Sequence, residues 1–309
     1  MDEKTVDVVV VGAGPAGLQA AVHAARKKAS VLILGRLGDS AIARAHVENY
    51  LCVDGVADGL ELLKIGLSQA TRFGAGHQEA DVLKIEQDGA GFRVETETGS
   101  VLARTLVLAT GSGRKKLKVP GERELLGKGV SYCVDCDANF FRNARVAVVG
   151  EGSAAVDGAL TLLGYTPHVT LVARRLQVSG ELRARLAASA ARVREGVWVT
   201  EITGDNEVRG LRLDDGSTLE MDGVFVELGA KGAVELAVTI GVALDSETMS
   251  HIAVNRKQET NIPGLYAAGD LTGQPHQMAK AVGEGCVAGW EAANLAHALR
   301  RQEQGGRTG

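Results

Sequence analysis

Cysteine is scarce in the 309-residue chain, which contains only Cys52, Cys133, Cys136 and Cys286. So few cysteines exclude the disulfide-stapled scaffold of small secreted proteins. In a cytosolic chain a close cysteine pair indicates redox chemistry or metal binding, and Cys133 and Cys136 form such a pair. Cys52 and Cys286 are interpreted as small buried or half-buried residues.

Long apolar runs and a strong net charge are also lacking. No stretch approaches the ~20 apolar residues of a membrane helix, so we expect no membrane span. The short apolar run at 6–11 ends in glycines and lacks a cleavage site, which indicates a buried strand and not a signal peptide. A net charge of −4 argues against nucleic acid or an anionic membrane as a partner recognised through bulk charge. We expect a cytoplasmic protein.

A weak internal repeat organises the chain. The segment "VDVVVVGAGPAGLQAA" (6–21) is echoed by "ARVAVVGEGSAAVDGA" (144–159). Each segment has an apolar run, a G-x-G-x-x-[GA] turn and an Ala-rich stretch, which is typical of a buried strand followed by its crossover helix. Because 309 residues exceed most single cores, the repeat predicts an α/β fold with two Rossmann-like nucleotide-binding domains.

Further strands and helices are expected around the two repeats. The strands are 29–35, a three-stranded meander followed by a separate buried strand within 81–111, 168–175, a second meander within 206–229, and a short strand within 261–273. The helices are 58–74, 179–189 with Ser179 as its cap, and about 276–300. The charged, Gly/Pro-punctuated segment 114–130 is interpreted as a crossing between domains.

The first glycine loop has the features of a dinucleotide site. Gly12 permits a tight turn, Gly14 removes a side chain that would block a pyrophosphate, and Gly17 lets helix and strand pack closely. At the end of the second strand stand Gly35 and Arg36, so the ribose-binding carboxylate expected there is missing.

The second glycine loop predicts a pyridine-nucleotide site through Gly150, Gly152, Ser153 and Ala154, although Glu151 adds a negative side chain. Arginines at the end of the next strand suit a ribose 2′-phosphate, so Arg174 and Arg175 favour NADPH over NADH. The alternative, two solvated arginines at a strand end, remains open.

These motifs together resemble the low-molecular-weight, bacterial-type thioredoxin reductases. The segments "VVVVGAGPAG", "VENY", "LVLATG", "VPGE", "SYCVDCD", "VAVVGEGSAA", "VARR", "TNIPGLYAAGD" and "AVGEGCVAG" follow that family's order and approximate spacing over nearly the whole chain. The resemblance implies a three-layer ββα architecture in both domains. It implies a discontinuous FAD domain, 1–115 with 244–309, and an inserted pyridine-nucleotide domain, 116–243, that carries the dithiol.

The resemblance also implies how the dithiol works. Cys136 would face the flavin, Cys133 would attack the substrate disulfide, and Asp137 would be the acid that protonates a leaving thiolate. Asp135, inside the cysteine pair, is unusual and should raise the pKa of the thiols by like-charge repulsion.

The FAD-contacting residues are likewise implied by resemblance. They comprise Gly12, Ala13, Gly14, Pro15, Ala16, Gly35, Arg36, Ser40, Asn49, Val82, Ala109, Thr110, Gly111, Gly269, Asp270, His276, Gln277 and Met278. His276 stands where the family has arginine, and it could tune the flavin or cap the last helix.

Zinc is the main alternative for the cysteine pair, but the chain offers neither a second C-x-x-C nor an H-x(3–5)-H pair to complete a site. We therefore expect no metal. An incidental structural disulfide is a second alternative.

Departures from the family pattern concern the electron donor and the flavin site. Ala173 replaces the histidine of the NADPH signature, and Ser179 replaces a later arginine. Gly38-Asp39-Ser40 stands in place of a Gly-Gly-Gln stretch, and 229–233 lacks the usual proline and asparagine. The chain is thus similar to an atypical member with a degraded NADPH signature.

The resulting hypothesis is a homodimeric FAD-dependent disulfide reductase that passes electrons from NADPH to thioredoxin or a similar small dithiol protein. One alternative keeps flavin and dithiol but uses reduced ferredoxin as donor, or acts as a small-molecule dithiol oxidase. Another is a non-catalytic flavin redox sensor.

Overall fold

The chain divides into two units in a computed structural model that describes residues 5–111, 116–246 and 250–305. The first unit is discontinuous and comprises Met1–Ser112 with Gly232–Gly309. The second unit is the intervening segment Gly113–Lys231. The α/β class and the insertion of one Rossmann-like unit into another are confirmed.

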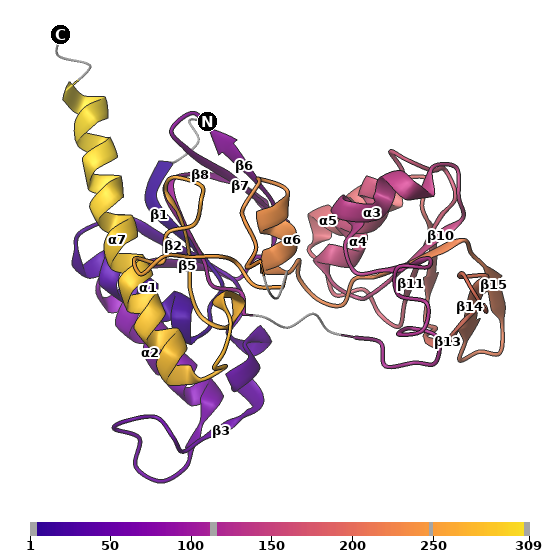
Figure 1. Cartoon of the computed structure of the whole chain (residues 1–309), viewed down its shortest axis with the longest axis horizontal. Helices are drawn as coiled ribbons and strands as arrows, with labels where there is room; N and C mark the ends of the chain where they lie inside the picture. The colour runs from indigo at the N-terminus through magenta and orange to yellow at the C-terminus, as the bar shows by residue number, and fades with distance from the viewer. Residues whose placement is uncertain (1–4, 112–115, 247–249, 306–309) are drawn as a thin grey trace. The chain divides into compact units, whose positions relative to one another are not determined.

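The first unit is built on a mixed sheet with the strand order β5-β2-β1-β8-β7-β6, and β17 also pairs with β8 (Figure 1). The central pairs are parallel, whereas β6–β7 and β7–β8 are antiparallel. The strands are β1 (Thr5–Val11), β2 (Val31–Leu34), β5 (Gly76–Gln78), β6 (Val82–Asp88), β7 (Gly91–Thr96), β8 (Gly99–Leu108) and β17 (Leu265–Ala267).

Helices cover one face of the parallel strands, and the β6–β7 hairpin together with one short helix covers the other face. Alternate residues of β1 point to opposite faces, so Val8 and Val10 pack with the helices while Val9 and Val11 pack with Phe92 of the hairpin layer. The three layers are those expected. The helices are α1 (Pro15–Arg26), α2 (Gly59–Arg72), α6 (Ala233–Val238) and α7 (Met278–Gly305).

Short elements complete the first unit. They are a two-stranded pair, β3 (His46–Val47) with β4 (Ala57–Asp58), and the 3-10 turns η1 (Leu37–Asp39), η2 (Ala41–Arg44) and η4 (Asp270–Thr272). Asp58 caps α2 by accepting a hydrogen bond from the Glu61 amide at 3.0 Å, which accounts for the start of that helix.

The second unit repeats the layout with a parallel sheet in the order β12-β11-β10-β16-β9. These strands are β9 (Val130–Ser131), β10 (Val146–Val149), β11 (Val169–Ala173), β12 (Arg192–Glu195) and β16 (Gly223–Val226). An antiparallel layer, β13 (Val199–Thr203), β14 (Gly210–Leu213) and β15 (Thr218–Glu220), packs on one face through Leu211 and Val199.

Its helices are α3 (Val134–Asp137), α4 (Ser153–Leu162) and α5 (Gly180–Ala187), with the 3-10 turn η3 (Ala138–Phe141). Ser179 caps α5 as expected, because its hydroxyl accepts a hydrogen bond from the Leu182 amide at 3.2 Å.

Two strand expectations were wrong. The separate buried strand after the first meander does not exist, because β8 is one continuous strand whose first half pairs with β7 while it runs parallel to β1. The last part of the expected second meander, β16, instead joins the parallel sheet beside β10. Its residues Gly223–Val226 are fully buried, so they belong in a central strand covered on both faces.

The expected domain boundaries also differ from the two units. Residues 232–243, expected in the inserted domain, pack with the first unit: α6 contacts β6, and Leu236, Ala237 and Val242 lie in the first unit's core. The burial of these apolar side chains therefore decides that residues 232–243 belong to the first unit. The boundary expected at 115/116 falls on residues 112–115, which lie outside the described residues.

Candidate active site

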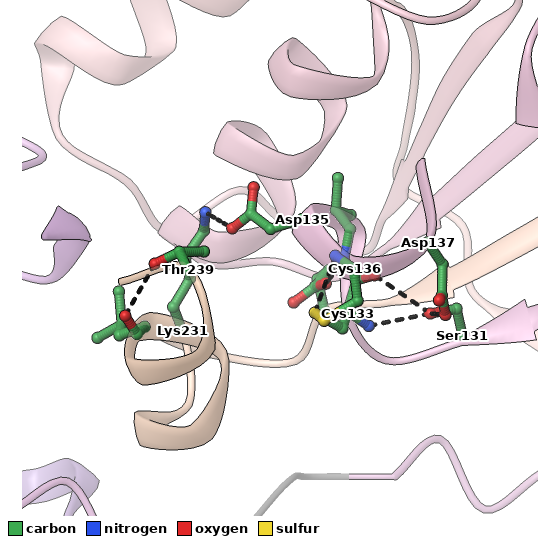
Figure 2. Close-up of a disulfide and its surroundings, with 10 residues drawn as sticks. Ser131, Cys133, Asp135, Cys136, Asp137, Lys231 and Thr239 are labelled. Carbon is green, nitrogen blue, oxygen red and sulfur yellow. Dashed lines mark hydrogen bonds and ion pairs between the residues drawn. A yellow bond between two sulfur atoms is a disulfide. The ribbon is translucent and has the colours of Figure 1, made fainter. Parts of the chain in front are cut away.

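The cysteine pair lies at the start of α3 in the second unit. Cys133 is the N-cap of this one-turn helix and Cys136 lies within it, and the two sulfurs are joined by a disulfide (Figure 2). The Cys136 amide donates a hydrogen bond to Cys133 Sγ at 3.2 Å. Val134, fully buried between the cysteines, anchors the turn against Gly158 of α4. The helix thus holds the two cysteines at bonding distance.

The two cysteines differ in exposure. Cys133 is only 5% exposed, whereas Cys136 is exposed. The expected division, in which Cys133 meets the substrate and Cys136 faces the flavin, stays a prediction, and these exposures favour the opposite order. The physical reason is local: Cys133 follows the buried strand end at Ser131, while Cys136 lies on the solvent side of the helical turn.

Ser131 links the acid to the dithiol. Its hydroxyl donates a 2.6 Å hydrogen bond to Asp137 Oδ2, and its oxygen accepts a 3.0 Å bond from the Cys133 amide (Figure 2). The Asp137 amide also donates to the Cys133 carbonyl at 3.2 Å. The arrangement brings Asp137 to the dithiol as expected, and it adds Ser131, which the sequence reasoning missed.

Asp135 does not stand alone between the cysteines. Its carboxylate accepts a 2.8 Å hydrogen bond from Lys231 Nζ, which also contacts Asp157 Oδ2 of α4 at 2.9 Å. Figure 2 shows Asp135 turned toward Lys231. A buried ammonium group therefore opposes the charge of Asp135, and the expected rise in the pKa of the thiols stays a prediction.

A large apolar side chain is exposed beside the dithiol. Phe140, in η3, is 81% exposed, while its neighbour Phe141 packs edge-on against Phe225 with ring centroids 5.1 Å apart. Phe141 therefore anchors the segment in the core, and Phe140 is presented to solvent.

The first glycine loop connects β1 to α1. Gly12 has φ +114°, and a methyl group on it would lie 2.3 Å from the Ala109 carbonyl oxygen. A Cβ on Gly17 would lie 1.9 Å from the Gly12 carbonyl oxygen, so the close packing of helix on strand requires glycine. Gly14 is the N-cap of α1, no side chain caps this helix, and Pro15 occupies its first turn. The first-turn amides are thus left for an anion.

The predicted flavin-site residues of the carboxy-terminal motif converge on this loop. A Cβ on Gly269 would lie 3.0 Å from Ala16 Cβ, which places the Gly269 turn against the start of α1. Asn49 Nδ2 donates a 2.9 Å hydrogen bond to Gln277 Oε1, joining two predicted residues far apart in the sequence. Asp270 begins η4, directly after Gly269, and Met278 begins α7.

His276 is exposed and precedes the first residue of α7, with its ring centroid 6.1 Å from that of His251. No capping contact from His276 to the helix is found among the described residues. The structure therefore adds nothing to the helix-capping alternative.

Two further predicted residues lie next to the loop, and a third, Val82, lies in β6. Gly35, with φ +137°, approaches the Ala13 amide, and Ser40 Oγ is the atom nearest to a Cβ built on Gly14. Val82 is buried at the start of β6.

Arg36 is held by two acidic side chains. It forms ion pairs with Asp81 and with Glu97, whose side chains are mostly buried. The sequence reasoning missed both acids. Because they bind the Arg36 guanidinium, this arginine is not a free ligand for a phosphate.

An unsatisfied polar atom supports the fit of a ligand to this site. Ala109, Thr110 and Gly111 follow β8, and the Ala109 amide bonds to Val11 O at 2.8 Å. Thr110 Oγ1 is buried and lacks a hydrogen-bond partner among the described residues. A buried hydroxyl without a partner is costly, so a bound group that reaches it would stabilise the loop. Together with the uncapped amides of α1, this fits the phosphate-and-ribityl arm of FAD.

In the second glycine loop, between β10 and α4, more of the backbone already has hydrogen-bond partners or close neighbours. Gly152 is the N-cap of α4 without a side-chain cap, but the Ala154 amide already donates to the Gly229 carbonyl at 3.3 Å. Gly150 is tightly packed, since a Cβ there would lie 2.0 Å from the Glu227 carbonyl oxygen. Fewer amides are therefore left for a pyrophosphate than at α1.

The predicted ribose-phosphate residues lie at the end of β11. The Glu151 carboxylate accepts a 3.3 Å hydrogen bond from the Arg175 amide, so a negative group already lies where a 2′-phosphate is expected. The Arg174 guanidinium lies over the Trp198 ring at 4.9 Å, and both arginines are exposed. The loop and its arginines are thus brought together as expected, with an acidic side chain between them.

The described residues contain no cluster of three or more histidine, cysteine or acidic side chains that could hold a metal ion. Among the same residues, each helix is too short or too polar to cross a lipid bilayer.

Two Rossmann-like units, a glycine loop shaped for a dinucleotide and a disulfide with an adjacent acid define a flavoprotein-type disulfide oxidoreductase. Residues 6–285 match the pyridine nucleotide-disulphide oxidoreductase family. The chain belongs to this family and is a thioredoxin reductase-like, FAD-dependent disulfide oxidoreductase; FAD and NADPH are the cofactors that thioredoxin reductases of the family use.

Several relatives resemble it over nearly its whole length. A thioredoxin reductase of Listeria monocytogenes is 34% identical over 97% of this chain and 96% of its own. An atypical thioredoxin reductase, TRi, of Desulfovibrio vulgaris Hildenborough is 38% identical with a TM-score of 0.81, covering 94% of this chain and 98% of the other. A ferredoxin-flavin thioredoxin reductase of Clostridium acetobutylicum is 34% identical with a TM-score of 0.67, covering 95% and 99%.

Of the residues that sequence reasoning missed near the dithiol, Ser131 is close in sequence, whereas Lys231 and Glu227 are distant. Ser131 lies inside the quoted "SYCVDCD" motif, so the motif itself was a signal. Lys231 is separated from Asp135 by 96 residues, and only the fold brings them together. Glu227, which accepts a 3.4 Å hydrogen bond from the Val134 amide, is equally distant in sequence.

Proposed function

We propose that the chain reduces the disulfide of thioredoxin or a similar small dithiol protein through Cys133 and Cys136, as a cytoplasmic homodimer. The observation that carries the proposal is the disulfide at the start of α3, with Cys136 exposed and Asp137 beside it. Thioredoxin reductases among the similar proteins support thioredoxin as the partner.

The first unit is proposed as the FAD domain and the second as the pyridine-nucleotide domain. The uncapped amides of α1 and the unpartnered Thr110 hydroxyl support the first assignment. FAD supplies two-electron chemistry: it accepts a hydride and passes both electrons to a disulfide. The second assignment rests on the repeated glycine loop before α4.

Exchange with the substrate is proposed to begin at Cys136, because this residue is exposed whereas Cys133 is buried. In the reduced protein the Cys136 thiolate attacks the substrate disulfide, which forms a mixed disulfide and releases one substrate thiolate. The Cys133 thiolate then attacks Cys136 Sγ, which restores the Cys133–Cys136 bond and releases the second substrate sulfur. Two electrons have then passed from the dithiol to the substrate.

Asp137 is proposed to supply the proton that a leaving thiolate takes up. The Ser131 hydroxyl bond at 2.6 Å fixes the orientation of its carboxyl group next to the dithiol. A positioned acid of this kind typically contributes a factor of about 10² to 10⁴ in rate.

The docking of the partner is proposed to use Phe140. An 81% exposed phenylalanine is unfavourable in water, and its position four residues after Cys136 suits contact with a protein bound at the disulfide.

A second donor is supported by specific observations. The Ala154 amide is occupied by the Gly229 carbonyl, and the Glu151 carboxylate lies at the Arg175 amide. Both reduce what the second unit offers to NADPH. A similar solved structure is a ferredoxin-flavin thioredoxin reductase. Reduced ferredoxin is therefore the alternative donor for the same dithiol chemistry.

The test is anaerobic stopped-flow reduction of the purified yellow protein with NADPH, NADH and reduced ferredoxin in parallel, followed by addition of oxidised thioredoxin. We expect one donor to bleach the visible absorbance of the flavin, and thioredoxin to restore it over several turnovers. Bleaching by ferredoxin alone would select the second donor. No reoxidation by any small disulfide protein would contradict the proposed function.

A further inference from the structure

The Lys231 cluster, formed by Lys231, Asp135 and Asp157, lies in the second unit and includes the residue between the two cysteines. The Lys231 ammonium group contacts Asp135 Oδ2 at 2.8 Å and Asp157 Oδ2 at 2.9 Å. The Lys231 side chain is only 5% exposed, and the two carboxylates are 23% and 15% exposed. Burial at this level makes the ion pairs much less screened by water than surface pairs.

Asp135 is the link between this cluster and the chemistry. It lies between the two cysteines in the sequence, and an unneutralised charge at that position disfavours thiolate formation by like-charge repulsion. The other acidic groups near the dithiol have the same sign: Asp137 is hydrogen-bonded to Ser131, and Glu227 accepts the Val134 amide. Lys231 is the cation that contacts Asp135 and Asp157.

The ammonium group remains charged over the physiological range. Burial lowers the pKa of Lys231, but the neighbouring carboxylates of Asp157 and Asp135 outweigh burial and raise it above its ordinary value. The positive charge of Lys231 therefore does not change as the thiols titrate.

We propose that Lys231 is a positioning residue of the dithiol, which holds the Asp135 carboxylate turned away from the sulfurs and neutralises it, and thereby keeps the thiol of Cys136 reactive at neutral pH. The inference deepens the proposed function and rests on it for the role of the dithiol. It explains how an acidic residue is tolerated between two cysteines that must form thiolates.

The test measures the pKa of the Cys136 thiol in the full-length, flavin-containing protein. The protein is reduced with excess dithiothreitol and freed of it anaerobically, and the rate of iodoacetamide alkylation is followed from pH 5 to 10. Peptide mass spectrometry separates Cys136 from Cys52, which is also exposed. The readout needs neither an electron donor nor thioredoxin, so it can succeed or fail independently of the turnover experiment.

In Lys231→Met the charge on Asp135 is left unopposed. We expect the Cys136 pKa to rise by about one unit, which slows alkylation near pH 7 about tenfold. The matched control Lys231→Arg keeps the positive charge and should retain the wild-type profile. The double variant Lys231→Met with Asp135→Asn should return the pKa to near the wild-type value, because the charge between the cysteines is gone.

Asp157→Asn should shift the Cys136 pKa in the opposite direction to Lys231→Met. It leaves Lys231 to Asp135 alone and removes one negative charge, so we expect the pKa to fall by about half a unit. A purely structural ion pair predicts loss of stability in each variant without opposite shifts in pKa. Should Lys231→Met fail to fold, the fall in Asp157→Asn still decides the question.

An unchanged Cys136 pKa in folded Lys231→Met would overturn the inference. So would a rise in Asp157→Asn, or a double variant whose pKa stays as high as that of Lys231→Met alone.

Discussion

The two cysteines of the dithiol have the same chemistry but different surroundings. Cys133 is buried at the end of a strand, and Cys136 is exposed on a helical turn. Each cysteine gives up one electron when the disulfide forms, so the two are equivalent in that respect. Exposure, in contrast, decides which of them a folded protein partner can reach. At the residue scale, therefore, the order of the exchange steps depends on burial.

This difference predicts which variant traps a substrate. Cys133→Ser leaves the exposed Cys136 thiol without a resolving partner, and we expect it to accumulate a mixed disulfide with a thioredoxin that lacks its own resolving cysteine. Cys136→Ser, the matched control, retains only the buried thiol and should trap at least tenfold more slowly. Non-reducing electrophoresis measures both. Faster trapping by Cys136→Ser would restore the division of roles that the family resemblance implies.

At the element scale, the two glycine loops show how one motif produces two environments. The α1 loop leaves its first-turn amides without a side-chain cap, and Thr110 Oγ1 is unpartnered nearby. In the α4 loop the Gly229 carbonyl takes up the Ala154 amide. Neighbouring segments thus decide how much of a helix N-terminus is left for a ligand.

The first loop predicts the effect of a single methyl group. Gly12→Ala forces a residue with a side chain into φ +114° and places its Cβ 2.3 Å from the Ala109 carbonyl. Strain of this kind costs about 1–3 kcal/mol before the clash is counted. We expect loss of most bound flavin, measured by the visible absorbance per protein after gel filtration. Gly180→Ala, where a Cβ meets nothing within 4 Å, should keep full flavin content.

At the scale of the whole molecule, each unit has its own core. Leu211 is fully buried in the core of the second unit, and Leu106 is fully buried in that of the first. Large-to-small changes at such positions cost about 2–5 kcal/mol because they leave a cavity. Separate cores mean that damage to one unit need not unfold the other.

This predicts a matched pair of variants. Leu211→Ala should lower the thermal stability of the second unit and slow disulfide turnover, while flavin stays bound during mild heating. Leu106→Ala should instead release flavin at a lower temperature. Flavin fluorescence during thermal unfolding, together with circular dichroism, measures both. Flavin release at the same temperature in the two variants would contradict independent cores.

Much of the fold follows from local patterns. The apolar run before Gly12 and its echo before Gly150 predicted both parallel sheets, since such runs suit strands buried on both faces. Ser179 was predicted as a helix cap from its position alone. The strand β8 was mispredicted because one strand can pair with different partners along its length, which a linear pattern does not record.

The sequence by itself determined the class of protein, because glycine spacing, apolar runs and a C-x-x-C pair are local features with strong physical requirements. Only the tertiary structure decided which sulfur is accessible, where residues 232–243 pack, and that Lys231 balances Asp135. Burial and charge pairing between residues about a hundred positions apart depend on how the chain folds back on itself, and no local pattern encodes them.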